Sequence, residues 1–210
     1  MFVPNPIDAQ ACEFNADTRA KKIAELGAEL SVDLNNKTII GTATAFMPYK
    51  NPLFLIDVFA QYLKLNSNAY LLVAGDGPMR NEVEAHAKQK LTEGTYRILG
   101  KRDDVAQLLQ AYDSFVLPSK NEGLPLCIME AQAADLPCFM ATSITDEAIV
   151  LKDRVARLSL KSGPEVWANA LNKTLNASEE RRSTTAKIVS DAGFNLNSPA
   201  KILPYLTSAK

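Results

Sequence analysis

The chain is poor in the residues that most often hold metal ions or form nucleophile–base pairs. Its 210 residues include one histidine, three cysteines and one tryptophan. A metal site with several histidine ligands is therefore a poor candidate, and a serine–histidine–aspartate triad would have to be centred on His86. His86 lies in the polar stretch EVEAHAKQK, which has the composition of an exposed helix. We interpret it as a solvated surface residue.

The cysteines are too few and too widely spaced for a disulfide framework or a metal site. Cys12, Cys127 and Cys138 are an odd number, and their spacings match no metal-ligand pattern. We interpret them as reduced thiols of a cytosolic protein. Cys127 and Cys138 fall in apolar stretches, where a buried thiol packs as a small hydrophobic side chain.

Long hydrophobic runs and an excess of one charge are also missing. No apolar run approaches the roughly 20 residues that span a bilayer, and Met1–Gln10 lacks the basic head and apolar stretch of a secretory signal. The formal net charge of −1 gives no general attraction to nucleic acid or anionic lipid. We expect a cytoplasmic protein without a nucleic-acid partner and without direct membrane insertion.

From Thr38 onward, short apolar runs alternate with longer stretches of helical periodicity. The runs that predict strands are Thr38–Thr44, Ala69–Ala74, Thr95–Leu99, Asp113–Leu117 and Pro137–Ala141. The stretches that predict helices are Pro52–Leu65, Met79–Lys90, Val105–Ala111 and Leu126–Ala134. Repeated strand–helix–strand units indicate a parallel sheet covered by helices on both faces. We predict one Rossmann-like α/β domain with about six parallel strands.

The two ends of the chain are less regular. Residues 1–37 are expected to contain a first helix packed on the domain formed by residues 38–210. Beyond the fifth strand, the pattern offers a further short strand in two places and three more helices. These stretches are Ile144–Val150 and Val155–Leu160 for the strand, and Gly163–Leu175, Glu179–Asp191 and Ala200–Leu206 for the helices.

A glycine-rich turn, Gly75-Asp76-Gly77-Pro78, directly follows the predicted strand AYLLVA. Two glycines let the backbone turn sharply and approach a ligand, and the N-terminus of the following helix is electropositive. By itself the turn is equally compatible with a tight strand-to-helix connection that binds nothing.

The loop after the fourth strand carries a stronger pattern, in which seven residues separate Glu122 from Glu130. Carboxylates accept hydrogen bonds from sugar and ribose hydroxyls. Between them, the backbone N–H groups of Gly123 and Leu124 approach a helix N-terminus, which suits a diphosphate. The alternative is that Glu122 caps this helix and Glu130 lies on its solvent face, and for an isolated pair of glutamates that alternative is favoured.

The pair is not isolated, because four ordered blocks together resemble one family. The blocks are AFMPYKNPLFLIDVFAQ, VAGDGP, ILGKRDDVAQLLQAYD and LPSKNEGLPLCIMEAQAADLP. They resemble the donor domain of retaining glycosyltransferases with two Rossmann domains, the GT-B fold, and in particular the bacterial group 1 enzymes of capsular and exopolysaccharide synthesis. The similarity runs from about Pro4 to Leu160 and continues more weakly to the end.

The resemblance implies roles for the residues of the second pattern and for one lysine. Glu130 matches a glutamate that binds ribose hydroxyls, and Glu122 matches a catalytic-site glutamate near the donor sugar. Gly123 and Leu124 match the loop whose amides meet the diphosphate and sugar. Lys50 matches a lysine that neutralises the diphosphate, a role for which a charged side chain is suited. The alternative for Lys50 is a solvated surface lysine.

The resemblance also implies where the nucleobase lies. Leu99, Gly100 and Lys101 match the segment after the third strand that lines the base pocket, largely through backbone contacts. Gly75 and Gly77 match the loop beside that pocket.

Three positions depart from the family pattern. Thr44 and Ala45 stand where the family has a glycine–arginine pair, and losing that cation would weaken donor binding by roughly 1.5–3 kcal/mol, or about 10–150-fold. Pro6 replaces a glycine in the linker Asn-Gly-Ile-Asp, which stiffens or reshapes that hinge. Asp135 replaces a glycine in the turn before the fifth strand, and aspartate tolerates a left-handed turn better than most residues.

Taken over the whole chain, the resemblance implies the donor half of a hexosyl-type glycosyltransferase. Residues 1–37 then contain the former interdomain linker, and an N-terminal acceptor domain is missing ahead of it. We expect a UDP-sugar as substrate, no cofactor and no metal, and negligible transfer by this chain alone. The full enzyme would work in the cytoplasm or at the inner membrane face. The alternative is a degenerate, non-catalytic nucleotide-sugar-binding or scaffold protein; an epimerase of related architecture is disfavoured.

Overall fold

A parallel six-stranded sheet forms the centre of the computed structural model, which describes residues 7–177, 181 and 184–194. Its strands are β1 Thr38–Ala43, β2 Ala69–Ala74, β3 Tyr96–Gly100, β4 Ser114–Leu117, β5 Cys138–Ala141 and β6 Val155–Leu158. They lie in the order β3-β2-β1-β4-β5-β6, and every neighbouring pair is parallel. The predicted fold, an α/β Rossmann-like domain with about six parallel strands, is confirmed.

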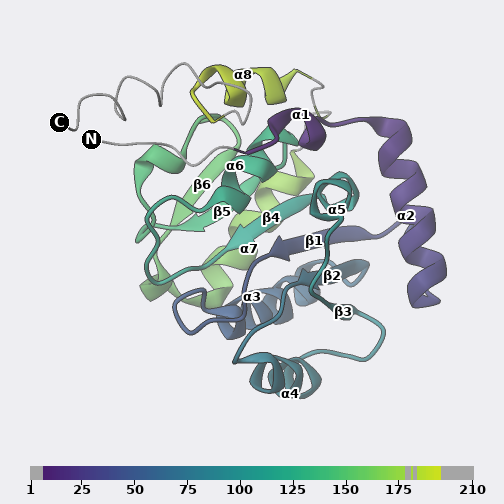
Figure 1. Ribbon diagram of the computed structural model, residues 1–210. Coiled ribbons are helices and arrows are strands. Elements are labelled where there is room, and N and C mark those ends of the chain that lie inside the picture. The colour runs from purple at the N-terminus through teal and green to yellow at the C-terminus, as the bar shows by residue number, and fades with distance from the viewer. Residues whose placement is uncertain (1–6, 178–180, 182–183, 195–210) are drawn as a thin grey trace.

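The strand order fixes the place where a ligand would bind. The chain runs outward from β1 through β2 to β3, and then returns to the other side of β1 as β4 (Figure 1). In open parallel sheets, the connections leave in opposite directions at such a reversal, and the carboxyl ends of the strands border a crevice there. β1 and β2 pair over their full length, from Thr38↔Ala69 to Ala43↔Ala74, so their carboxyl ends are level.

Helices cover both faces of the sheet, as predicted. They are α1 Ala9–Cys12, α2 Ala16–Leu30, α3 Pro52–Leu65, α4 Arg80–Lys90, α5 Val105–Ala111, α6 Leu126–Ala133, α7 Gly163–Asn176 and α8 Thr185–Asp191. The buried side chains of α1, α2, α5, α6 and α8 form one hydrophobic cluster, and those of α3, α4 and α7 form another on the opposite face. Figure 1 shows α1, α6 and α8 above the sheet and α3 and α4 below it.

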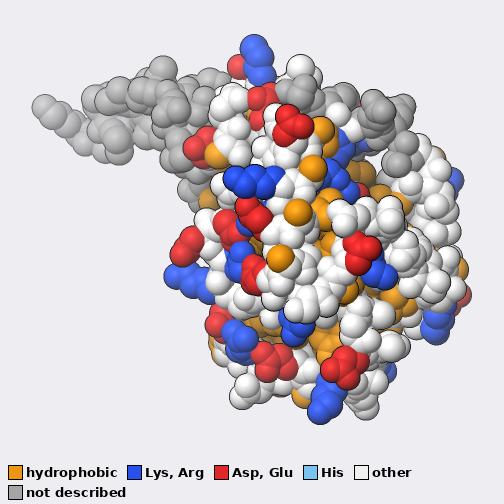
Figure 2. All heavy atoms as spheres, turned by 90° about the vertical axis from the view of Figure 1, so that its right-hand side faces the viewer, with side chains coloured by type: hydrophobic (Ala, Val, Ile, Leu, Met, Phe, Trp, Pro, Cys, Tyr) orange, Lys and Arg blue, Asp and Glu red, His pale blue; other side chains and the backbone are white. Residues whose placement is uncertain are grey.

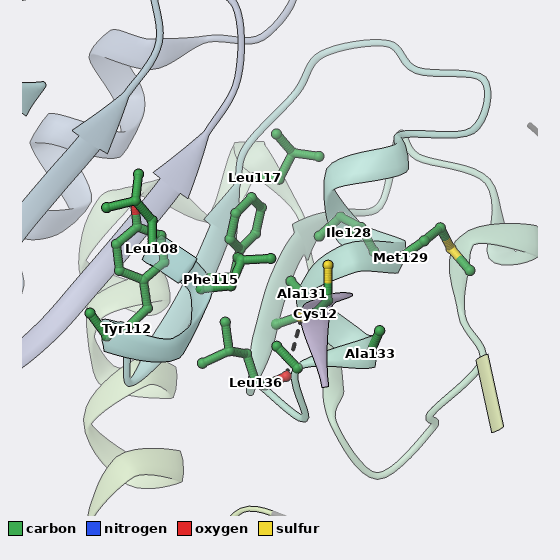
Figure 3. Close-up of a cluster of buried hydrophobic side chains, with 14 of the residues drawn as sticks. Cys12, Leu108, Tyr112, Phe115, Leu117, Ile128, Met129, Ala131, Ala133 and Leu136 are labelled. Carbon is green, nitrogen blue, oxygen red and sulfur yellow. Dashed lines mark hydrogen bonds between the residues drawn. The ribbon is translucent and has the colours of Figure 1, made fainter. Parts of the chain in front are cut away.

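Each face has a core of close-packed rings. In the first cluster, shown in Figure 3, Tyr112 packs so closely on β1 that a Cβ added to Gly41 would lie 2.2 Å from the Tyr112 Cδ2 atom. Position 41 therefore accepts only glycine without rearrangement. On the other face, the Trp167 ring of α7 meets the Phe54 ring of α3 edge-on, with centroids 5.5 Å apart.

The N-terminal segment packs on the sheet domain. α2 lies against α5, and α1 lies against α6 and α8. The predicted tail helix Ala200–Leu206 and the hinge residues Asn5 and Pro6 lie outside the described residues, as do Glu179 and three of the next four positions.

The further strand forms at only one of its two predicted places. Val155–Leu158 is β6, whereas the stretch Ile144–Val150 contains a short 3-10 turn at Asp146–Ala148, so a strand there was wrong. The reason is Gln132 of α6. The side-chain NH2 group of Gln132 donates to the Ala148 carbonyl at 2.7 Å. Its side-chain oxygen accepts from the backbone N–H groups of Val150 and Leu151. These backbone groups pair with a side chain rather than with a strand.

The turn before β5 is held by a buried ion pair. Asp135 adopts the left-handed conformation, with φ at 54°, as expected for an aspartate in place of glycine. Its carboxylate is buried and binds the Arg154 guanidinium through two bonds of 2.9 Å. The aspartate thus adds a link to the segment that leads into β6.

Two expectations about single residues can be compared with the structure. His86 is half-buried rather than solvated, since its Nε2 atom lies 2.8 Å from an oxygen of Asp57 and joins α4 to α3. Cys12, Cys127 and Cys138 are free thiols, and burial raises the pKa of Cys12 and of Cys127 to about 12. None of the three is activated as a nucleophile.

The surface carries no block of one charge on the side where α2 lies. Figure 2 shows basic and acidic side chains intermingled on that face, as the net charge of −1 suggests. Within the described ranges, no helix is both long and apolar enough to cross a bilayer.

Candidate functional site

A cavity of about 400 Å³ opens at the carboxyl ends of β1, β2 and β3. It is lined by Ala43, Thr44, Ala45, Ala74, Gly75, Asp76, Lys101, Arg102, Val105 and Glu130. Three of the ten predicted site residues, Gly75, Lys101 and Glu130, therefore share one cavity. It lies at the end of the sheet where the strand order predicts a ligand.

A larger cavity, of about 780 Å³, lies at the opposite end of the sheet, but its cations are already bound. Arg19 donates to three backbone carbonyls at the end of α5 and pairs with Asp113 at 2.6 Å. Arg181 donates to carbonyls of the same helix end and stacks on the Phe14 ring, 4.0 Å from its centroid. Both guanidinium groups already bind the carbonyl groups at the end of α5. They are therefore engaged within the protein, and this cavity is the weaker candidate for a ligand site.

Glu130 is the most informative residue of the first cavity. It lies in α6 and is half-buried, and its carboxylate has no hydrogen-bond or ion-pair partner among the described residues. Burial raises the pKa of its carboxyl group. A half-buried carboxylate without a protein partner is costly, and its free acceptor oxygens face the cavity. The alternative of a fully solvated helix face does not describe this position.

The glycine turn after β2 forms part of the cavity wall. A Cβ added to Gly75 would lie 1.9 Å from the Thr44 carbonyl oxygen, and one added to Gly77 would lie 2.8 Å from the Phe46 carbonyl oxygen. Both glycines are therefore required by the close approach of this turn to the loop after β1. That loop is bonded to the turn, because the Phe46 N–H donates to the Asp76 carbonyl at 2.9 Å.

The end of β3 closes the cavity on the other side. Gly100 has a φ of 72°, and its carbonyl accepts from the Gly75 N–H at 2.8 Å, which brings the turns after β2 and β3 together. Lys101 is exposed on the cavity rim and has no ion-pair partner in the described part of the chain. Leu99 is half-buried and packs on the first hydrophobic cluster. Of these three, only Lys101 presents a side chain to the cavity.

Arg102 also lines the cavity, and the sequence analysis missed it. Its guanidinium makes two bonds of 2.8 Å to the Asp104 carboxylate and a third, of 2.9 Å, to Glu29 of α2. Asp104 is also paired with Lys22 of α2 at 2.7 Å, and these cations lower its pKa strongly. The run Arg-Asp-Asp at 102–104 was the available signal. The network fastens α2 to the rim of the cavity.

Lys50 and Glu122 form an ion pair, and neither residue lines the cavity. The Lys50 Nζ atom contacts the Glu122 Oε1 atom, and the two side chains are only 13% and 10% exposed. Ser119 donates its hydroxyl to the same Glu122 oxygen at 3.0 Å. Lys50 is therefore not a solvated surface lysine. Glu122 does not cap α6 either, because the helix has no side-chain cap hydrogen bond.

Glu130 and the acidic member of the ion pair flank the start of α6. Glu122 lies four residues before the helix, and Glu130 lies one turn along it from Cys127. Lys50 is tied to this segment through its contact with Glu122. Gly123, in the adjoining loop, is exposed, and a Cβ added there would meet nothing within 4 Å. Leu124 packs on the first hydrophobic cluster.

The arrangement matches a known family over most of the sheet domain. The pattern that defines the family described as "Glycosyl transferases group 1" matches residues 31–188. The chain belongs to this family. The putative glycosyltransferase EpsF of Bacillus subtilis is 31% identical over 194 residues, which are 92% of this chain and 49% of that protein. A UDP-Gal:alpha-D-GlcNAc-diphosphoundecaprenol alpha-1,3-galactosyltransferase of Escherichia coli is 29% identical, over 92% of this chain and 50% of that protein.

Solved structures share the fold. The Anabaena protein Alr3699/HepE in complex with UDP-glucose superposes with a TM-score of 0.75 at 21% identity, over 98% of this chain and 57% of that one. The C-terminal domain of a group 1 family protein, LpcC, from Francisella tularensis superposes with a TM-score of 0.67 at 19% identity, over 89% of this chain and 95% of that one. The chain spans about half the length of the curated relatives it matches, and it corresponds to a C-terminal GT-B domain.

This group 1 glycosyltransferase domain has an uneven supply of cations around its cavity. Ala45 contributes only a methyl group to the lining, at the position where the resemblance predicts an arginine. Arg102 is held by two carboxylates, and Lys50 is held by Glu122. Lys101 is thus the one lining cation without an ion-pair partner among the residues that the structure describes.

Proposed function

We propose that this domain binds a nucleoside diphosphate sugar, with UDP as the nucleotide, as the donor half of a retaining glycosyltransferase. The observation that carries the proposal is Glu130, a half-buried carboxylate that has no partner among the residues placed by the structure and that lines a cavity of about 400 Å³. This volume lies within the range of roughly 300–1,000 Å³ that is usual for small-molecule sites. The Anabaena structure with UDP-glucose, which shares the fold, supports the choice of nucleotide.

In this proposal the nucleoside occupies the cavity. Glu130 accepts hydrogen bonds from the ribose hydroxyls. The base lies between the turn at Gly75 and Gly77 and the end of β3, where the backbone of Leu99 to Lys101 can contact it. The interlocked turns support this placement, because they give the pocket a rigid wall.

The diphosphate and the sugar lie toward α6. The amides of Gly123 and Leu124 and the N-terminus of α6 would meet the diphosphate, with Lys50 as its cation. Glu122 would accept a hydroxyl of the donor sugar. The contact between Lys50 and Glu122 just before α6, and the position of Glu130 in the same helix, support this arrangement.

The chemical step breaks the bond between the anomeric carbon and a diphosphate oxygen, and the bonding electrons leave with the diphosphate. Lys50 and the amides offset the charge that develops there. The acceptor hydroxyl attacks on the face that the diphosphate leaves, so the anomeric configuration is retained, and its proton passes to a donor phosphate oxygen. This scheme uses no cofactor and no histidine.

The acceptor would bind to a second domain. We propose a saccharide or a lipid-linked acceptor in polysaccharide synthesis, as the printed name of the E. coli relative suggests for that protein. Transfer requires that donor and acceptor be aligned in a site from which water is excluded. A single wall does not exclude water, so the 210-residue domain alone should show negligible transfer in a radiolabelled-donor assay.

Calorimetric titration with UDP and with GDP tests the donor site. Glu130→Ala should weaken UDP binding about tenfold or more, because a carboxylate that binds hydroxyls contributes roughly 1.5–3 kcal/mol. Glu93→Ala is the matched control, since Glu93 is exposed and lies in the loop before β3, away from the cavity lining. UDP binding that is equal in all three proteins would contradict the proposal.

The second candidate is a degenerate donor domain that serves as a scaffold, and Ala45 favours it. If the wild type binds neither nucleotide and Ala45→Arg restores binding, the degenerate function is supported. If the wild type already binds UDP and Ala45→Arg only strengthens that binding, the donor function is supported.

A further inference from the structure

The ion pair between Lys50 and Glu122 occupies two groups that the proposed donor also needs. Lys50 is the cation assigned to the diphosphate, and Glu122 is the acceptor assigned to the sugar. In the structure each is bound to the other, and both side chains are largely covered. In the resting site these two charges therefore neutralise each other.

The acidic partner is the more firmly held of the two. Ser119 is buried and donates to the same Glu122 oxygen that contacts Lys50. The Ser119 carbonyl in turn accepts the Ser143 hydroxyl at 2.6 Å, and Glu122 forms an isolated backbone bridge to Ile144. The loop after β4 is thus fastened to the loop after β5.

The loop after β5 is itself anchored to β6. The Arg157 guanidinium donates to the carbonyls of Thr142 and Ile144, both at 2.8 Å, and pairs with Asp146. Glu122 is therefore held by bonds that run from the loop after β4 to the loop after β5, and from there to β6. Lys50 lies at the end of a turn, and besides Glu122 its side chain contacts the Tyr49 ring, whose centroid is 5.5 Å from the Nζ atom. Its long, flexible side chain makes it the partner that can move.

We propose, on the basis of the donor function above, that donor binding exchanges this ion pair. The diphosphate takes Lys50 from Glu122, and the released carboxylate then accepts a hydroxyl of the sugar. The site thereby recognises the diphosphate first and the sugar second. A free sugar cannot bind Glu122 in this way, because Glu122 is still paired with Lys50. Glu122 acts as an internal competitor of the diphosphate for Lys50.

The exchange predicts that removing the competitor strengthens anion binding. Inorganic pyrophosphate and UDP are titrated calorimetrically into the wild type and into Glu122→Gln, Lys50→Met and the double variant. Glu122→Gln should bind both ligands about three- to tenfold more tightly than the wild type. In the Lys50→Met background the same substitution should change affinity by less than twofold, because the cation for which Glu122 competes is gone. Melting temperatures verify that each variant is folded.

Two results would overturn the exchange. One is equal or weaker pyrophosphate binding by Glu122→Gln; the other is an equal gain in the Lys50→Met background, which would reflect general charge and not the pair. If Glu122→Gln does not fold, Glu122→Asp replaces it, since the shorter acid loses the contact with Lys50 and should also bind pyrophosphate more tightly. Binding of neither ligand by any variant refutes the exchange as well.

The same data separate this inference from the donor function. Tighter pyrophosphate binding by Glu122→Gln, together with UDP binding that does not respond to Glu130→Ala, supports the exchange and contradicts the donor site. UDP binding that depends on Glu130 but does not tighten in Glu122→Gln does the reverse.

Discussion

Replacing Glu130 by glutamine removes a charge from the cavity wall and leaves the shape of the side chain nearly unchanged. The carboxylate is half-buried and has no partner among the described residues. Its partial removal from water therefore costs free energy that no hydrogen bond or ion pair offsets. Glu130→Gln should therefore stabilise the empty domain by about 1 kcal/mol, within the range of typical stabilising substitutions. In a domain of this size that raises the melting temperature by about 2–4 °C.

The gain should depend on pH, and its sign follows from the raised pKa. Burial raises the pKa of Glu130 in the folded state above the ordinary value of about 4.3. The folded protein keeps this proton to higher pH than the unfolded chain does. Wild-type stability contributed by the neutral carboxyl is therefore complete at acid pH and is lost as pH rises through the raised pKa. The glutamine variant has no such loss, so the two melting curves should nearly coincide near pH 4 and separate by pH 7.

Differential scanning calorimetry from pH 4 to pH 7 measures this separation, with Glu93→Gln as the exposed control. A melting temperature of Glu130→Gln that falls below that of the wild type at pH 7 would refute the reasoning, because it would mean that the charge has a stabilising partner. A gap that is the same at every pH would refute it too. The same variant should bind UDP more weakly, so stability and binding are expected to move in opposite directions.

Two further predictions concern the frame of the domain. Asp135→Asn removes the buried carboxylate that binds the Arg154 guanidinium, and should lower the free energy of unfolding by about 3 kcal/mol, measured by urea denaturation; a loss below about 1 kcal/mol would contradict this expectation. Gly41→Ala places a Cβ 2.2 Å from the Tyr112 ring and should destabilise by about 1–3 kcal/mol. Combining it with Tyr112→Leu should recover part of that loss, and no recovery would contradict the steric explanation.

The sequence predicted the helices and strands well where local signals agree. The helix at Pro52–Leu65 was predicted to the residue, because proline suits its first turn and its apolar residues recur on one face. The strands were found because parallel strands buried on both faces are apolar runs bounded by polar turns. The strand predicted at Ile144–Val150 does not form, because the backbone there bonds to the side chain of Gln132, which is distant in sequence.

Some of the residues that line the cavity were predicted from the sequence, but the contacts between side chains around it were not. Glu130 and Lys101 were found through the motif pattern, and both line the cavity. The contact between Lys50 and Glu122 joins loops after two different strands, and no local pattern encodes it. Arg102 was missed although Asp104, which accepts two of its bonds, is only two residues away; its third bond, to Glu29, joins it to a helix that precedes the whole sheet.

The interlocking of the turns after β1 and β2 has a consequence for engineering. The Thr44 N–H donates to Ala74, the Met79 N–H donates to Phe46, and the Gly75 backbone leaves no room for a side chain beside Thr44. If only one of these two segments were replaced by that of a homologue, the new segment would not fit the other, which keeps its original sequence and shape. Chimeras intended to change donor preference should therefore exchange residues 43–47 and 75–79 together, as one cassette.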